Sequence, residues 1–81
     1  MPSSLRTLKV NERARIVSIN AGSEISRRLR DMGLVPGTDL QVIGRAPLKD
    51  PVALRLRNFT LTLRNNEADF IQVEKLEEDN V

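Results

Sequence analysis

The chain has 81 residues, with 13 Lys and Arg against 11 Asp and Glu, which gives a formal net charge of +2. It contains neither cysteine nor histidine, so it has no disulfide framework, no thiolate or imidazole metal site, and no acid–base side chain with an ordinary pKa near neutrality. This length predicts a single small domain over residues 1–76, near the size at which one hydrophobic core just suffices.

The first regular element is expected over residues 13–20, which are rich in β-branched side chains and are followed by a turn sequence. This pattern predicts a strand. Its register stays open, because Ala14 with Ile16 and Val17 with Ile19 would each form an apolar face.

A short helix is predicted over residues 24–32. Ile25, Leu29 and Met32 recur at the spacing that places three apolar side chains on one helical face. Ser23 is expected to cap the free amides at the start of this helix. The opposite face is therefore left to charged side chains.

The end of this helix is marked by Gly33, which adopts a left-handed conformation at little cost because it lacks a Cβ atom. Leu34 can supply the hydrophobic contact that usually accompanies such an end. Pro36-Gly37 predicts a tight turn, and a second strand is expected over residues 40–46.

The clearest alternation in the chain lies over residues 52–57 and 59–64, where apolar side chains occupy every second position. Two such runs joined at Arg57-Asn58 predict an antiparallel hairpin. Residues 65–68 resemble a single helical turn, and a last strand is expected at 71–73.

These elements predict a mainly β fold with one short helix. About five short strands in an open sheet would leave edges exposed and one face uncovered, whereas a small, closed or half-closed β-barrel removes both problems. Phe59 and Phe70 are expected in core or turn positions.

Charge is distributed unevenly along the chain. Residues 1–73 contain 12 Lys and Arg against 7 Asp and Glu, a balance of +5, whereas residues 74–81 carry −3. We expect residues 77–81 to be an acidic, flexible tail. Its carboxylates could hold a divalent cation only weakly, so no metal and no cofactor is expected.

Catalysis is not expected, because serine, threonine, lysine and carboxylates have no histidine or cysteine to activate them, and no phosphate-binding glycine loop is present. No apolar run reaches the roughly 20 residues that cross a bilayer, which favours the cytoplasm. Arg55, Arg57 and Arg64 are expected to solvate the hairpin and to discourage association through its edge.

Several strings along the chain resemble the FeoA family, ferrous iron transport protein A. They are R-R-L-R-D-M-G-L-V-P-G at 27–37, A-P-L-K-D-P-V at 46–52 and L-T-L-R-N-N-E-A-D-F-I-Q-V at 61–73, within a similarity that covers roughly Leu5 to Val73. One departure is Asn11, where the family often has glycine; asparagine also adopts left-handed conformations, so the turn can be kept.

The resemblance implies an SH3-like β-barrel that regulates a membrane ferrous iron transporter of the FeoB type, whose cytoplasmic part binds guanine nucleotide. The protein would then be cytoplasmic, peripheral to the inner membrane through its partner, and without a small-molecule substrate. Two alternatives remain: a small basic barrel that binds single-stranded nucleic acid, which the scarcity of aromatic residues disfavours, and a detached regulatory domain related to those of metal-dependent repressors. Self-association through an exposed strand edge also remains open.

Two segments are the predicted partner-binding residues. The first comprises Arg27, Arg30 and Asp31 on the polar face of the helix, because arginine pairs with carboxylates and is enriched in interfaces. The second and weaker candidate is the loop with Pro47, Leu48 and Lys49.

Overall fold

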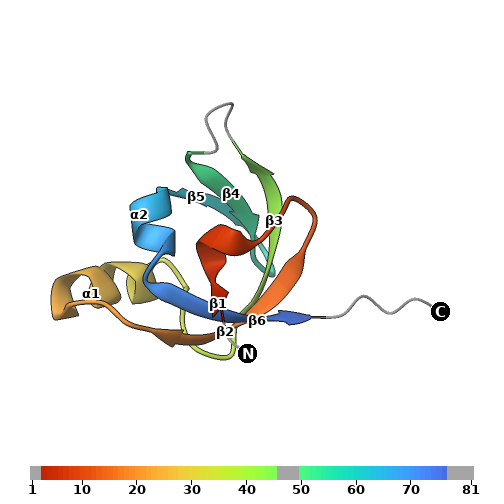
Figure 1. Ribbon diagram of the computed structural model, residues 1–81. Coiled ribbons are helices and arrows are strands. Elements are labelled where there is room, and N and C mark those ends of the chain that lie inside the picture. Colours follow the sequence, from red (N-terminus) through yellow and green to blue (C-terminus); the bar gives the residue numbers. More distant parts are fainter. Residues whose placement is uncertain (1–2, 46–49, 77–81) are drawn as a thin grey trace.

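The computed structural model describes residues 3–45 and 50–76 and forms a six-stranded antiparallel sheet of order β1-β6-β2-β3-β4-β5 (Figure 1). The strands are β1 (Ser3–Ser4), β2 (Arg13–Ile19), β3 (Asp39–Arg45), β4 (Val52–Arg55), β5 (Thr60–Leu63) and β6 (Ile71–Leu76). The helical segments are the 3-10 turn η1 (Leu5–Thr7) and helices α1 (Ser23–Asp31) and α2 (Asn65–Ala68). The sheet curls so that α2 and η1, which contact one another, lie in the opening between its two edge strands.

The sheet has one strand more than the five that the sequence predicts. This extra strand, β1, is only two residues long and pairs with Val73 and Gln72 of β6. Two serines carry no alternation of apolar side chains, so the sequence offers no periodic signal for this strand. The mainly β class is confirmed.

A β-bulge resolves the register of β2. Ala14 and Ile16 face the core, and the pairing with β6 shifts between Ile16 and Ser18. Val17 is the extra residue and is 40% exposed, while Ile19 returns to the core side and packs against the buried residues. Both apolar pairs are therefore used, because the bulge changes the phase of the strand.

The β4–β5 hairpin is confirmed, with Val52 opposite Leu63 and Arg55 opposite Thr60. The Leu56 N–H donates to the Phe59 carbonyl at 2.8 Å, which places the turn at Arg57-Asn58. The helical turn at 65–68 is also confirmed as α2.

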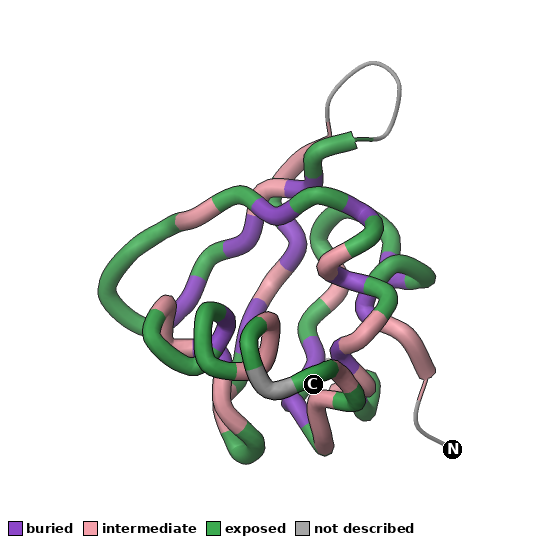
Figure 2. The backbone as a smooth tube through the Cα atoms, turned by 90° about the vertical axis from the view of Figure 1, so that its left-hand side faces the viewer, coloured by how far each residue is buried: buried purple, intermediate pink, exposed green. Residues whose placement is uncertain are grey.

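Buried and exposed positions alternate along the strands, as Figure 2 shows. The core unites side chains from every part of the described chain: Leu5, Leu8, Ala14, Ile16, Leu29, Leu34, Leu40, Val42, Val52, Leu54, Leu56, Leu63, Ala68, Ile71 and Val73. Phe59 takes the turn position of the two that were expected: it is 48% exposed at the hairpin tip, where its ring lies over Gly33. Among the described helices, none is long and apolar enough to cross a membrane.

Candidate functional site

Helix α1 carries the predicted contact residues and begins one residue earlier than expected. The helix starts at Ser23, and its N-cap is Gly22, whose backbone is extended and whose carbonyl accepts the Ser26 N–H at 2.9 Å. The prediction that Ser23 caps the helix is therefore wrong. Glycine is accepted at this position because the cap needs extended backbone more than a particular side chain.

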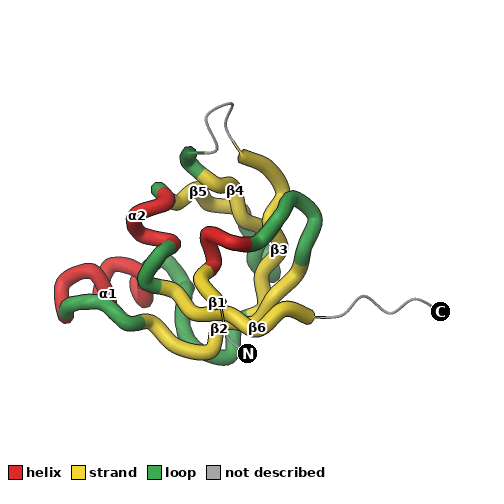
Figure 3. The backbone as a smooth tube through the Cα atoms, viewed as in Figure 1, coloured by secondary structure: helices red, strands yellow, loops and turns green. Residues whose placement is uncertain are grey.

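The apolar stripe of α1 anchors the helix to the barrel, as the sequence predicts. Leu29 is completely buried, and Ile25 and Met32 are partly buried against the same core. Figure 3 shows α1 as a separate helical segment beside α2. The buried stripe fixes which side of the helix faces outward.

The C-terminus of α1 forms a complete Schellman motif. Gly33 has φ +94°, its N–H donates to the Arg30 carbonyl at 2.9 Å, and the Leu34 N–H donates to the Leu29 carbonyl at 3.0 Å. Leu34 is fully buried, so the predicted hydrophobic contact is confirmed. These bonds hold the last turn of the helix in place.

The outward side of α1 presents Arg27, Arg30 and Asp31, which we call the helix surface. All three are exposed, and within the described part of the chain none of them forms an ion pair. Residues three and four positions apart are neighbours on a helix, so the three side chains form one continuous surface. It offers two guanidinium groups and one carboxylate to a partner.

Arg28 has a different role from its neighbours. Its Nη2 atom lies 3.1 Å from the Glu67 Oε2 atom, so an ion pair joins α1 to α2. The carboxylate of Glu67 also accepts the Arg64 N–H at 3.1 Å. The sequence did not indicate this role of Glu67, because its partner Arg28 lies far away in the chain.

The second predicted contact segment cannot be compared with the helix surface. Pro47, Leu48 and Lys49 lie outside the described residues, as does the acidic segment 77–81. Within residues 3–45 and 50–76, no group of three or more carboxylates is arranged to hold a metal ion.

The hairpin and the residue that follows it carry three arginines for which the sequence predicts a solvating role. Arg55, Arg57 and Arg64 are exposed and form no ion pair with any described residue. A hollow of about 510 Å³ opens beside β5, lined by Arg28, Asp50, Pro51, Thr62, Leu63, Arg64 and Glu67. The sequence signal for this region was the alternation of arginine and threonine with apolar residues.

Other charged groups form ion pairs with one another within the fold. Arg15 lies 2.8 Å from Asp39, a contact that raises the pKa of the Arg15 guanidinium. The hydrogen bond from Lys75, together with one from the Lys9 backbone N–H at 2.6 Å, lowers the pKa of Glu12. Asn11 is left-handed, with φ 77°, as the turn was expected to require.

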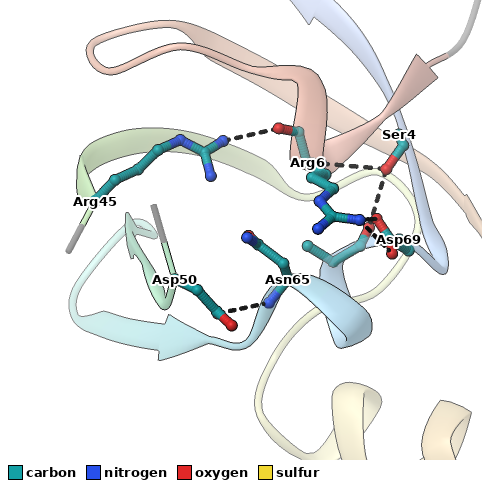
Figure 4. Close-up of polar contacts among 7 residues, drawn as sticks. Ser4, Arg6, Arg45, Asp50, Asn65 and Asp69 are labelled. Atoms are coloured by element: carbon teal, nitrogen blue, oxygen red, sulfur yellow. Dashed lines mark hydrogen bonds and ion pairs between the residues drawn. The ribbon is translucent and has the colours of Figure 1, made fainter. Parts of the chain in front are cut away.

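A cluster of polar contacts joins the N-terminal segment to α2 and to β3 (Figure 4). Arg6 binds Asp69 at 3.0 Å, and Arg45 donates to the carbonyl oxygens of Arg6 and Leu8 at 3.0 and 2.5 Å. Asp50 accepts the Asn65 N–H at 2.9 Å. These contacts join the N-terminal segment to β3 and to the end of α2.

Several known proteins are similar to this chain. The model of the FeoA domain matches residues 3–75. A Fe(2+) transport protein A/Fe(2+) transporter FeoB fusion protein from Porphyromonas gingivalis is 34% identical over 70 residues, which are 86% of this chain and 8% of that protein. The chain thus spans less than a tenth of that curated relative.

Solved structures agree with the fold. The NMR structure of a FeoA-like protein from Clostridium acetobutylicum has 38% identity and a TM-score of 0.89, covering 99% of this chain and 93% of that one. Stenotrophomonas maltophilia FeoA, a zinc complex described as an SH3 domain protein, has 27% identity and a TM-score of 0.76, covering 88% of each chain.

A manganese-dependent transcriptional repressor also has a similar region. It has 17% identity and a TM-score of 0.85, covering 93% of this chain and 37% of the repressor. At this identity, the likeness concerns the fold alone. The likeness to Stenotrophomonas maltophilia FeoA, described as an SH3 domain protein, confirms the SH3-like fold.

Proposed function

The chain belongs to the FeoA family of non-enzymatic accessory proteins of ferrous iron transport, and on that premise we propose that it regulates a FeoB-type transporter by direct contact. The contact would be with the cytoplasmic, guanine-nucleotide-binding part of the transporter. The protein would therefore act in the cytoplasm, reach the membrane only through this partner and use no small-molecule substrate.

One observation carries this proposal: a relative in which the two components share a chain. In the Porphyromonas gingivalis fusion protein, a region similar to this chain is covalently joined to a FeoB transporter. Covalent linkage makes association intramolecular and raises the effective concentration of the two modules. For a separate chain, the same association requires a binding surface.

The helix surface is the contact site we propose. Leu29 is buried on the opposite side of α1, and the Schellman motif fixes the C-terminal end of this helix. Arg27, Arg30 and Asp31 are therefore presented on a rigid element. Unpaired guanidinium groups can bind carboxylates of a partner bidentately without first breaking an internal ion pair. Pro47, Leu48 and Lys49 stay a second prediction for the same contact.

Co-purification from detergent-solubilised membranes of the host tests the proposal. The tagged chain should recover the transporter, and the experiment is run with and without guanine nucleotide. The combined Arg27→Glu and Arg30→Glu variant should reduce recovery at least tenfold, because it places like charges against carboxylates. Recovery of no transporter in either nucleotide state would contradict the proposed function.

A matched charge reversal separates a local contact from a general charge effect. Lys9→Glu with Arg13→Glu changes the net charge equally, at exposed positions before and within β2. This variant should recover the transporter as well as the unchanged protein does. If both double variants lose the transporter equally, the contact is not confined to the helix surface. Thermal unfolding by circular dichroism confirms that each variant is folded.

A further inference from the structure

The outer edge of β5 has no neighbouring strand in the described sheet. We propose that this edge binds an extended acidic segment of a partner protein by adding it to the sheet as a further strand. The proposal does not depend on the transporter, because it follows from the hydrogen-bonding groups and charges of the hairpin itself.

The backbone of β5 has donors and acceptors without a neighbouring strand. In an antiparallel pair, hydrogen-bonded and non-bonded residue pairs alternate. The bond from the Leu56 N–H to Phe59 makes that pair a bonded one, so Leu61 and Leu63 direct their backbone groups toward β4. The groups of Thr60 and Thr62 then point the other way.

No strand covers that outer side. The sheet ends at β5, and within residues 3–45 and 50–76 neither Thr60 nor Thr62 forms a hydrogen bond across this edge. Both threonines are exposed. Such an edge is the geometry that peptides use in strand addition, where main-chain bonds give affinity and alternate side chains give specificity.

Charge indicates which kind of segment fits. Arg55 lies directly opposite Thr60, Arg57 stands in the turn, and Arg64 follows Thr62 by two positions in extended backbone. None of these three arginines forms an ion pair with a described residue. Arg64 continues the line of β5, so a carboxylate of an incoming strand would lie across from it, and opposite charges across paired strands are stabilising. Arg55 lies on β4, on the far side of β5 from the incoming strand, and adds only a longer-range attraction.

The other side of the edge carries Leu61 and Leu63 beside a hollow that is lined mostly by charged and polar residues, among them Arg28, Asp50, Arg64 and Glu67. Leu63 is buried, Leu61 is only partly buried, and the hollow beside Thr62 and Leu63 continues toward Arg28 of α1. A strand that alternates acidic and apolar residues would place its carboxylates on the side of Thr60 and Thr62 and its apolar residues on the side of Leu61 and Leu63.

Pairing of this edge with a second copy is disfavoured by the same charges. Two antiparallel β5 strands would bring Arg64 of one molecule near the hairpin turn of the other, which contains Arg57. Like charges placed across paired strands are destabilising. The arginines thus oppose self-pairing while leaving the backbone groups open to an acidic strand.

NMR titration with a capped five-residue peptide that alternates glutamate and valine tests the proposal. The peptide should slow hydrogen exchange at the amides of Thr60 and Thr62 and shift their signals, with little effect on α1. A peptide with N-methylated glutamates keeps the charges but loses the backbone donors that face Thr60 and Thr62 in an antiparallel pair, and should bind about tenfold more weakly. Glutamine in place of glutamate should weaken binding and remove its salt dependence.

Two variants at one position provide the matched protein control. Thr62→Pro removes an outward N–H, and proline is tolerated where an edge N–H faces solvent, so this variant should fold and lose binding. Thr62→Ala keeps the N–H and should keep binding. Equal binding of the methylated peptide, an absence of binding at low salt, or protection of both amides in the free protein by self-pairing would each overturn the proposal.

Discussion

Most arginines of this small barrel fall into two regions that differ in how their charge is satisfied. The exceptions are Arg28 of α1, which pairs with Glu67, and Arg13 of β2, which is exposed and forms no ion pair with a described residue. Around the opening of the sheet, Arg6 and Arg45 bind Asp69 and backbone carbonyl oxygens, and on the outer face Arg15 binds Asp39. On α1 and the β4–β5 hairpin, five arginines have no ion pair within the described chain: Arg27, Arg30, Arg55, Arg57 and Arg64.

This difference separates cations that contribute to folding from cations available to a partner. A guanidinium group already bound to a carbonyl or carboxylate must lose that contact before it can bind elsewhere. The exposed, unpaired groups carry no such cost beyond the ordering of their side chains. We call the two sets the paired and the unpaired arginines.

Leu29→Ala is expected to have the largest effect on stability. Leu29 is fully buried beneath the helix surface, so the substitution leaves a cavity and should lower the free energy of unfolding by about 2–5 kcal/mol. Arg30→Ala, one residue away and exposed, should change it by less than about 0.5 kcal/mol. Urea denaturation measures both. An equal loss in the two variants would show that the unpaired arginines also stabilise the fold.

Gly33→Ala should have the next largest effect. The left-handed backbone disfavours a Cβ atom by about 1–2 kcal/mol, and that atom would lie 3.2 Å from the Phe59 ring. Gly37 has the same φ of +94° but open space around it, so Gly37→Ala reports the backbone cost alone. The difference between the two free energies of unfolding measures the contact of Phe59 with the end of α1.

The free energies of unfolding of Arg45→Ala and Arg55→Ala compare a paired with an unpaired arginine directly. Arg45 donates to two backbone carbonyl oxygens, so its loss should lower the free energy of unfolding by about 1 kcal/mol. Arg55, without an ion pair, should give a change near zero. The measurement is urea denaturation at two salt concentrations. Equal values would remove the distinction between the two sets.

The sequence predicts most of the fold because its signals are local. The alternation in 52–64 is enough for the hairpin, and the order Leu29, Gly33, Leu34 is enough for the buried helix face and its end. The strand β1 and the exposure of Phe59 were not predictable, because pairing with β6 and the position of the hairpin tip over α1 depend on residues far apart in sequence.

In the candidate sites, too, features set by local sequence were predictable and contacts between distant residues were not. Arg27, Arg30 and Asp31 could be placed on the outer helical face from spacing alone. The pairing of Arg28 with Glu67 could not, because it joins two helices that are separated by four-tenths of the chain. Predicting the free edge of β5 would also have required the strand order, since any of several strands could have ended the sheet.

The smallest effect is expected from Glu12, which belongs to the region where charges are paired. Hydrogen bonds from Lys75 and from the Lys9 N–H lower the pKa of Glu12 in the folded protein. A lowered folded-state pKa stabilises the fold above the unfolded-state value of about 4.3, and this contribution is lost as the pH falls through the folded-state pKa. Stability should therefore decline on acidification partly through this carboxylate.

Glu12→Gln should flatten that decline, because the amide does not titrate. The free energy of unfolding, measured by urea denaturation between pH 7 and pH 3, should fall less steeply with acid than in the unchanged protein. Glu24→Gln is the matched control, since Glu24 is exposed on α1 and forms no ion pair with a described residue. If both variants reproduce the original pH profile, the contacts of Glu12 with Lys75 and Lys9 do not stabilise the fold, and paired charges near β2 are no more structural than the unpaired arginines of α1.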